Sequence, residues 1–139
     1  MPLYAALVAA GLEHVYRSPV TLHNFAQAGS ASDAGLYTAD GIAAARPHLV
    51  IVAYTVMGRF PAYRDALASL CGAGVVLADV TSLWRDVLAR KRVYDLTGNG
   101  INHPNDFGHR LYAQVILSLL VDPLDWDPAS RRLEAPART

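Results

Sequence analysis

Two histidines, two asparagines and one aspartate fall within the eight residues 102–109. His103 stands directly before Pro104, and Asn105 and Asp106 follow at once. A residue before proline is pushed away from helical backbone angles, so we expect His103 to lie extended at the tip of a loop. Asn105 or Asp106 can then cap a helix. An imidazole on a rigid junction between a loop and a helix is well placed to act as a general base.

The stretch that begins at His103 reads His-Pro-Asn-Asp-Phe-Gly-His-Arg-Leu-Tyr-Ala. This stretch resembles the last conserved block of the SGNH/GDSL hydrolases, a family of serine esterases, lipases and acylhydrolases. The resemblance implies that His103 is the catalytic base and that the substrate is a small carboxylic ester, with no cofactor. It also implies an α/β fold, the three-layer flavodoxin-like fold with a parallel sheet.

A second, weaker match lies upstream, where residues 24–29 read Asn-Phe-Ala-Gln-Ala-Gly. This segment resembles the family's block Asn-x-Ala-x-x-Gly, whose glycine lends its backbone N–H to the oxyanion hole. By this resemblance Gly29 is the donor. Glycine suits the role because the backbone can then approach a developing oxyanion closely. A simple tight turn at Gly29 is the alternative interpretation.

The sequence departs from the family pattern at two further positions. Met57 stands where the family has an asparagine that donates to the oxyanion, and a thioether donates no hydrogen bond. Losing one such donor costs about 10²–10³-fold in rate. Gly100 stands where many members have an aspartate that orients the histidine. The remaining candidates to hold the His103 ring are a backbone carbonyl and the side chains of Asn99, Asn102, Asp95 and Asp106.

The nucleophile block of the family, Gly-Asp-Ser, does not occur in these 139 residues. The chain starts at the helix that follows this block in the family. We therefore expect the C-terminal portion of such a domain, truncated or degenerate, without its first central strand and inactive alone. Ser30 and Ser32 are the serines on a loop predicted at the active edge, and each is more typical of a turn or a helix cap.

Two other functions fit parts of this pattern. A non-catalytic binding or interaction module derived from the same fold would account for Met57, Gly100 and the missing serine together. A metal site would use His103, Asp106 and His109, which are all ligand types. Pro104 and the helix cap separate these three side chains, so they do not share one helical face, which makes a metal the less favoured interpretation.

Apolar runs alternate with helical patterns along the chain, as in a mainly parallel α/β domain. Residues 48–55 form a continuous apolar run, which is typical of a strand covered on both faces. We predict a domain over 1–121 and a surface tail over 122–139. The predicted strands are 19–23, 48–55, 74–80 and 94–97, and the predicted helices are 1–14, 35–45, 61–70, 82–91 and 106–120. The last helix is expected to bury Phe107, Leu111, Val115 and Leu119.

The amino-acid composition limits the classes of partner that we expect for this chain. Twelve basic and twelve acidic residues give a net charge of zero, so nothing points to nucleic acid or an anionic membrane. The apolar N-terminus is too short to span a bilayer. With no export signal visible we expect a cytoplasmic protein, or a secreted one if the true start lies upstream. The remaining partner is a missing N-terminal segment or a second copy in a homo-oligomer.

A lone cysteine and the histidines outside the motif receive structural interpretations. Cys71 cannot form an internal disulfide and is predicted to be a small buried filler. His14, His23 and His48 are predicted to be structural, with His23 and His48 half-buried and hydrogen-bonded beside strands.

Overall fold

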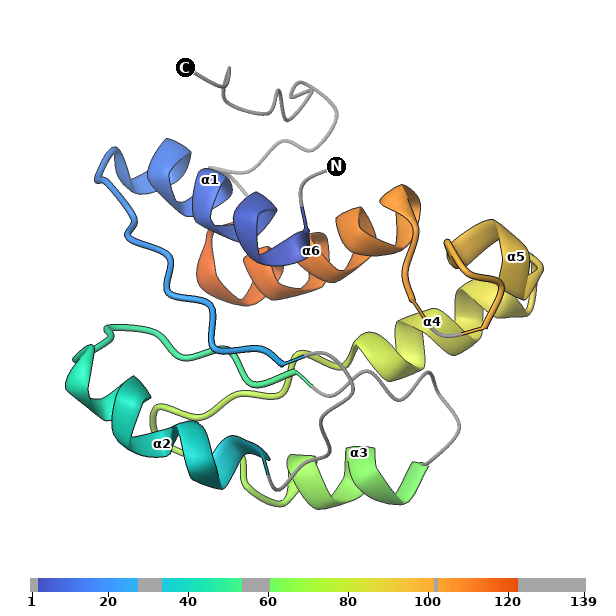
Figure 1. The fold of residues 1–139 in the computed structure, drawn as a ribbon. Helices are drawn as coiled ribbons and strands as arrows, with labels where there is room; N and C mark the ends of the chain where they lie inside the picture. Colours follow the sequence, from blue (N-terminus) through green and yellow to red (C-terminus); the bar gives the residue numbers. More distant parts are fainter. Residues whose placement is uncertain (1–2, 28–33, 54–60, 102, 123–139) are drawn as a thin grey trace.

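The computed structural model describes residues 3–27, 34–53, 61–101 and 103–122, which form six α-helices (Figure 1). Their bounds are α1 (Tyr4–Tyr16), α2 (Ala34–Ala44), α3 (Pro61–Ala68), α4 (Val80–Leu88), α5 (Val93–Leu96) and α6 (Asp106–Leu120). Gly29, Ser30, Ser32, Met57, Asn102 and the predicted tail beyond residue 122 lie outside the described residues.

The main core lies where α1 packs on α6, the two helices with the most extensive contact in the described part of the chain. Leu7 and Val8 of α1 are buried against the face of α6. Gly11 permits a close approach, since a Cβ there would lie 2.8 Å from the Leu117 Cδ1 atom. The members of this core are Leu7, Val8, Ala113, Ile116, Leu117 and Val121.

The predicted flavodoxin-like α/β fold with a parallel sheet is wrong. The described parts of the predicted strands 19–23, 48–55 and 74–80 form no sheet, and 94–97 falls largely within α5. The β-type pairs among the described residues are two isolated antiparallel ones, Gly72 with Val75 and Thr97 with Pro104. A continuous apolar run favours burial, but a ladder also needs a neighbouring strand in register. The described segments do not provide that register for one another.

The helix predictions fare better than the strand predictions. Each of the five predicted helical regions overlaps a helix, and α5 lies where a strand was predicted. The buried stripe predicted for α6 is wrong, however, because Phe107 and Leu119 are each 44% exposed. The face that α6 buries instead carries Gly108, Ala113, Ile116 and Leu117. Both stripes have helical spacing, and contact with α1 selects between them.

The predicted burial of the cysteine and of two histidines is also wrong. Cys71 is exposed, in the turn that follows α3, where its N–H donates to the Ala68 carbonyl. His23 and His48 are exposed as well, because the strands expected to enclose them do not pair. His23 stacks on Phe25 with the ring centroids 6.5 Å apart.

In Figure 1, α1 and α6 lie on one side of the molecule and α2 and α3 on the opposite side. The extended segments of residues 18–27, 45–53 and 75–79 run through the region between these two pairs of helices. α4 and α5 lead from this region to the loop that precedes α6. Of the helices the structure describes, none has the length and apolar character needed to cross a bilayer.

Candidate functional site

The loop that carries His103 is closed at its base by backbone hydrogen bonds. The Asn105 N–H donates to the Leu96 carbonyl at 3.0 Å, and the Gly98 N–H donates to the His103 carbonyl at 2.8 Å. These two bonds flank the antiparallel pair of Thr97 and Pro104. Thr97 is buried, and its hydroxyl donates to the Val93 carbonyl at 2.9 Å. The loop therefore connects the end of α5 to the start of α6, and hydrogen bonds hold its two ends together.

Asn99 organises the interior of this loop. Its side-chain oxygen accepts hydrogen bonds from the Ile101 N–H and the His103 N–H, each at 3.0 Å. An asparagine that bonds backbone groups a few residues ahead stabilises a turn without any help from distant elements. Asn99 is one of the candidates to orient the His103 ring, and in the structure its side-chain oxygen holds the backbone of the loop.

His103 has both of its backbone polar groups bonded while its side chain is exposed. Among the described residues, no side chain forms a hydrogen bond with its imidazole, and no serine hydroxyl reaches it. Asp106 is exposed in the first turn of α6, and Asp95 accepts from the Arg92 N–H at 2.9 Å. The imidazole is therefore exposed to solvent, while hydrogen bonds to the N–H and the C=O of His103 hold its backbone in place.

Asn105 links the loop to α6. Its side-chain oxygen accepts from the Gly108 N–H at 3.0 Å, which caps the helix as the sequence predicts. Its side-chain amide donates to the Asp95 carbonyl at 2.8 Å. One residue therefore satisfies a free N–H at the start of α6 and a free carbonyl at the end of α5.

Two glycines of the motif are explained by close contacts. A Cβ on Gly108 would lie 2.9 Å from the Leu96 carbonyl oxygen and 2.9 Å from the Pro104 Cβ atom. Gly100 has φ of 70°, and a Cβ there would lie 2.9 Å from the Tyr94 ring. Residues other than glycine rarely adopt this backbone conformation, so the turn favours glycine at position 100.

The second histidine of the motif has a different environment. The His109 ring stacks on Tyr4 of α1, with the centroids 6.2 Å apart and the planes 18° from parallel. Its Nδ1 atom is buried and has no hydrogen-bond partner among the described residues. Burial lowers the pKa of His109 below its ordinary value, and the Asp106 carboxylate opposes part of this shift. His109 therefore belongs to the contact between α1 and α6.

Aromatic rings continue from this contact toward α4. Tyr4 lies 5.6 Å from Tyr112, and Tyr112 meets the buried Trp84 edge-on at 5.7 Å. Burial raises the pKa of both tyrosines. The sequence gives no sign of this cluster, because its members are up to 108 positions apart, from Tyr4 to Tyr112. Trp84 is a core residue that connects α4 to α6.

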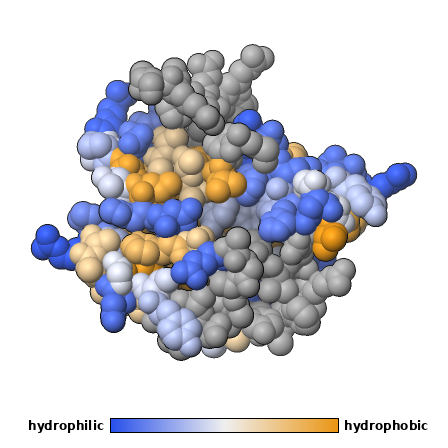
Figure 2. Space-filling model, viewed as in Figure 1, coloured by the Kyte–Doolittle hydropathy of each residue, from blue (hydrophilic) through white to orange (hydrophobic). Residues whose placement is uncertain are grey.

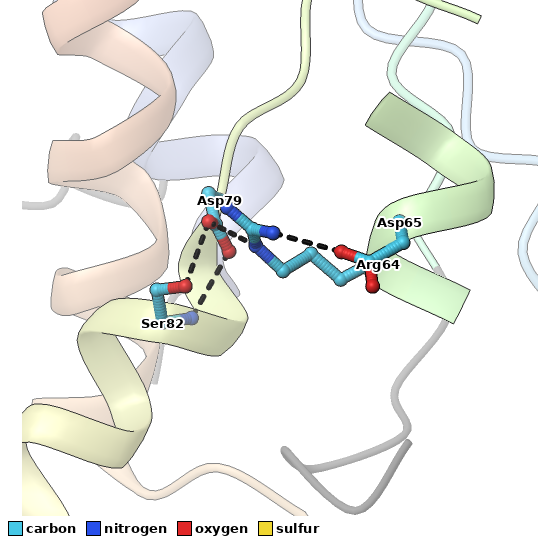
Figure 3. A network of polar contacts seen from close by, with 4 residues as sticks. All are labelled: Arg64, Asp65, Asp79 and Ser82. Atoms are coloured by element: carbon cyan, nitrogen blue, oxygen red, sulfur yellow. Dashed lines mark hydrogen bonds and ion pairs between the residues drawn. The ribbon is translucent and has the colours of Figure 1, made fainter. Parts of the chain in front are cut away.

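A polar network joins α3 to α4 (Figure 3). Asp79 caps α4 by accepting from the Ser82 N–H at 3.0 Å and from its hydroxyl at 2.7 Å. Arg64 of α3 donates its Nε–H to Asp79 at 2.7 Å and reaches Asp65 at 2.9 Å. Partial burial works to raise the pKa of Asp79, but the bonds from Arg64 and Ser82 outweigh it and lower the pKa. Asp79 is therefore the N-cap residue of α4.

The described residues contain no group of three or more His, Cys, Asp or Glu side chains arranged to hold a metal ion. His103, Asp106 and His109 all lie within this part of the chain. His109 turns into the contact with α1 while His103 is exposed, so the metal-binding alternative finds no support in the geometry.

Comparison with known proteins gives no family model, no curated protein and no solved structure that matches this chain.

Proposed function

We propose that the chain is the base-bearing part of a serine ester hydrolase in which His103 is the general base. The observation that supports this proposal best is the presentation of His103. Its N–H donates to Asn99 and its carbonyl accepts from Gly98, while the imidazole is exposed. A general base must be held in a defined position, and its side chain must be able to reach the group that it deprotonates.

In the proposed reaction a serine Oγ attacks the ester carbonyl carbon while the His103 imidazole accepts the hydroxyl proton. The imidazolium then returns that proton to the leaving alkoxide, which leaves an acylated serine. A water molecule, deprotonated by the same imidazole, attacks the acyl carbon, and the serine Oγ leaves with the proton that the imidazolium returns. The resemblance to the SGNH/GDSL block assigns the base to His103 and one oxyanion donor to the Gly29 N–H. The described serines are Ser18, Ser69, Ser82 and Ser118, and no hydrogen bond joins any of them to His103. None of these four described serines is therefore assigned as the nucleophile in this proposal.

The test supplies the missing block in trans. Hydrolysis of p-nitrophenyl acetate is measured for the chain alone and with a synthetic peptide that ends in Gly-Asp-Ser. We expect the buffer rate from the chain alone and added turnover with the peptide. That added turnover should disappear in His103→Ala and persist in His48→Ala, which removes another exposed histidine. Equal turnover in the two variants would contradict the role of His103.

A non-catalytic binding module is the second candidate, and one observation favours it. No described side chain bonds the His103 ring, and the Gly100 turn, under the Tyr94 ring, leaves no room for the family's orienting aspartate. For such a module, His103→Ala should leave the melting temperature unchanged, and the peptide should produce no turnover with any variant. That pair of results would replace the first proposal with the second.

A further inference from the structure

Asn99 is followed directly by a glycine, Gly100, in the loop that carries His103. It is the one of the four asparagines of the chain that precedes a glycine. Asn99 is exposed. Figure 2 shows largely hydrophilic surface on the side of the molecule where α5 and this loop lie in Figure 1. Water can therefore reach the Asn99 carboxamide.

The backbone nitrogen of Gly100 is accessible to this carboxamide. Among the described residues, no acceptor takes a hydrogen bond from the Gly100 N–H, so no bond must break before the nitrogen reacts. Glycine has no Cβ atom, and no side chain at position 100 shields the nitrogen from the preceding residue. Attack of this nitrogen on the Asn99 Cγ atom would close a five-membered ring.

The hydrogen bonds of the loop activate the carboxamide for this attack. The Asn99 Oδ1 atom accepts from the Ile101 N–H and the His103 N–H, each at 3.0 Å. Attack at Cγ moves negative charge onto Oδ1, and hydrogen bonds to a charged acceptor are roughly twice as strong as those to a neutral one. The two N–H groups therefore stabilise the transition state more than the ground state, as backbone donors do in an oxyanion hole.

We infer that Asn99 is a modification site, at which the loop promotes deamidation of Asn99 by the Gly100 nitrogen. Hydroxide removes the Gly100 N–H proton, and the nitrogen forms a bond to Asn99 Cγ. The bond from Cγ to Nδ2 breaks, and Nδ2 takes a proton from water and leaves as ammonia. Water then opens the imide ring. Opening at Cγ gives aspartate, and opening at the backbone carbonyl carbon gives isoaspartate.

The two products affect the loop differently. Aspartate keeps an oxygen that can accept from the Ile101 N–H and the His103 N–H. Isoaspartate adds one methylene to the backbone before Gly100 and moves the carboxylate, so both N–H groups lose this acceptor. Isoaspartate therefore releases the backbone of His103. The modification does not depend on ester hydrolysis, and it applies equally to a binding module.

The experiment compares the native full chain with the same chain unfolded in guanidinium chloride, both at mildly alkaline pH. Peptides are weighed by mass spectrometry, because loss of ammonia and gain of water add one mass unit. We expect the peptide that contains Asn99 to gain this mass on the order of 10-fold faster in the native chain, since only the folded loop holds the two donors on Oδ1.

Asn24 offers a matched control. Its Oδ1 atom accepts one hydrogen bond, from the Ala26 N–H at 3.0 Å, and the next residue is Phe25. Phe25→Gly places a glycine after Asn24, and circular dichroism checks that this variant keeps the helical content of the wild type. In this variant the two asparagines should react at similar rates when the chain is unfolded, and Asn99 should react faster when it is native.

Three results would overturn the inference. The first is no gain of mass at Asn99 in the native chain, and the second is a native rate at or below the unfolded rate. The third is a native Phe25→Gly variant in which Asn24 reacts as fast as Asn99, because the following glycine alone would then set the rate.

Discussion

The side-chain oxygen of Asn99 accepts a hydrogen bond from the His103 N–H at 3.0 Å and a second from the Ile101 N–H. Each such bond contributes about 1 kcal/mol net. Asn99→Ala should therefore accelerate exchange of these two amides roughly 5- to 30-fold, which corresponds to about 1–2 kcal/mol. Asn99→Asp keeps the acceptor and should exchange like wild type. Equal acceleration in both variants would show that the oxygen does not hold the loop.

Gly108 should resist substitution by alanine although it lies in a helix. Alanine normally stabilises a helix interior by about 1 kcal/mol relative to glycine. Here the added Cβ would lie 2.9 Å from the Leu96 carbonyl oxygen, so we expect a loss of roughly 1–3 kcal/mol in urea unfolding. Gly72→Ala is the control, since nothing lies within 4 Å of its Cβ position. A stabilised Gly108→Ala variant would contradict the close packing of α6 on the end of α5.

His109 should make stability depend on pH. Because burial lowers the pKa of His109 in the folded state, the unfolded chain binds the proton more tightly. Its contribution is complete above a pH of about 6.5, falls as the pH drops below that value, and levels off below the folded-state pKa. His109→Phe keeps a ring against Tyr4 and should flatten the dependence.

This dependence is measured as the free energy of urea unfolding between about pH 7.5 and pH 5, the range in which histidine titrates. His14→Phe is the control, because His14 is exposed near the end of α1. If His14→Phe and His109→Phe flatten the curve equally, the buried Nδ1 atom of His109 is not its origin.

Asp79 should matter more to stability than its neighbour Asp86 on the same helix. Asp79→Ala removes the cap of α4 and the contact with Arg64, and we expect a loss of about 1–2 kcal/mol, most of it from the cap. Asp86→Ala changes an exposed position and should stay within about 0.5 kcal/mol of wild type. Thermal unfolding of both variants decides the matter, and similar losses would refute the capping role.

The parts of the structure that the sequence predicts are those with local causes. The Asn105 cap and α6 follow from residues within a few positions of each other, and a side chain that caps its own helix needs no distant partner. Two other features of the structure also have local signals in the sequence. Asp79 before an apolar helical run is a cap signal, and Gly108 inside a helix is an unfavourable residue that indicates close packing.

The parts that the sequence does not predict depend on contacts between distant residues. Burial of Ile116 rather than Leu119 depends on where α1 lies, and no spacing within α6 contains that information. The absent sheet has the same origin. The apolar run at 49–52 predicts an extended and buried segment. In the structure the segment is extended but exposed, because no described strand pairs with it.

Among the described residues, the hydrogen bonds that fix the loop around His103 join residues no more than ten positions apart, and most are closer. The loop therefore has low contact order, so we expect it to form early and at small entropic cost. Substitutions in α2 or α3 would leave it unchanged. A motif built in this way can outlast large changes in the rest of the chain, and can be moved as a unit into another helical protein.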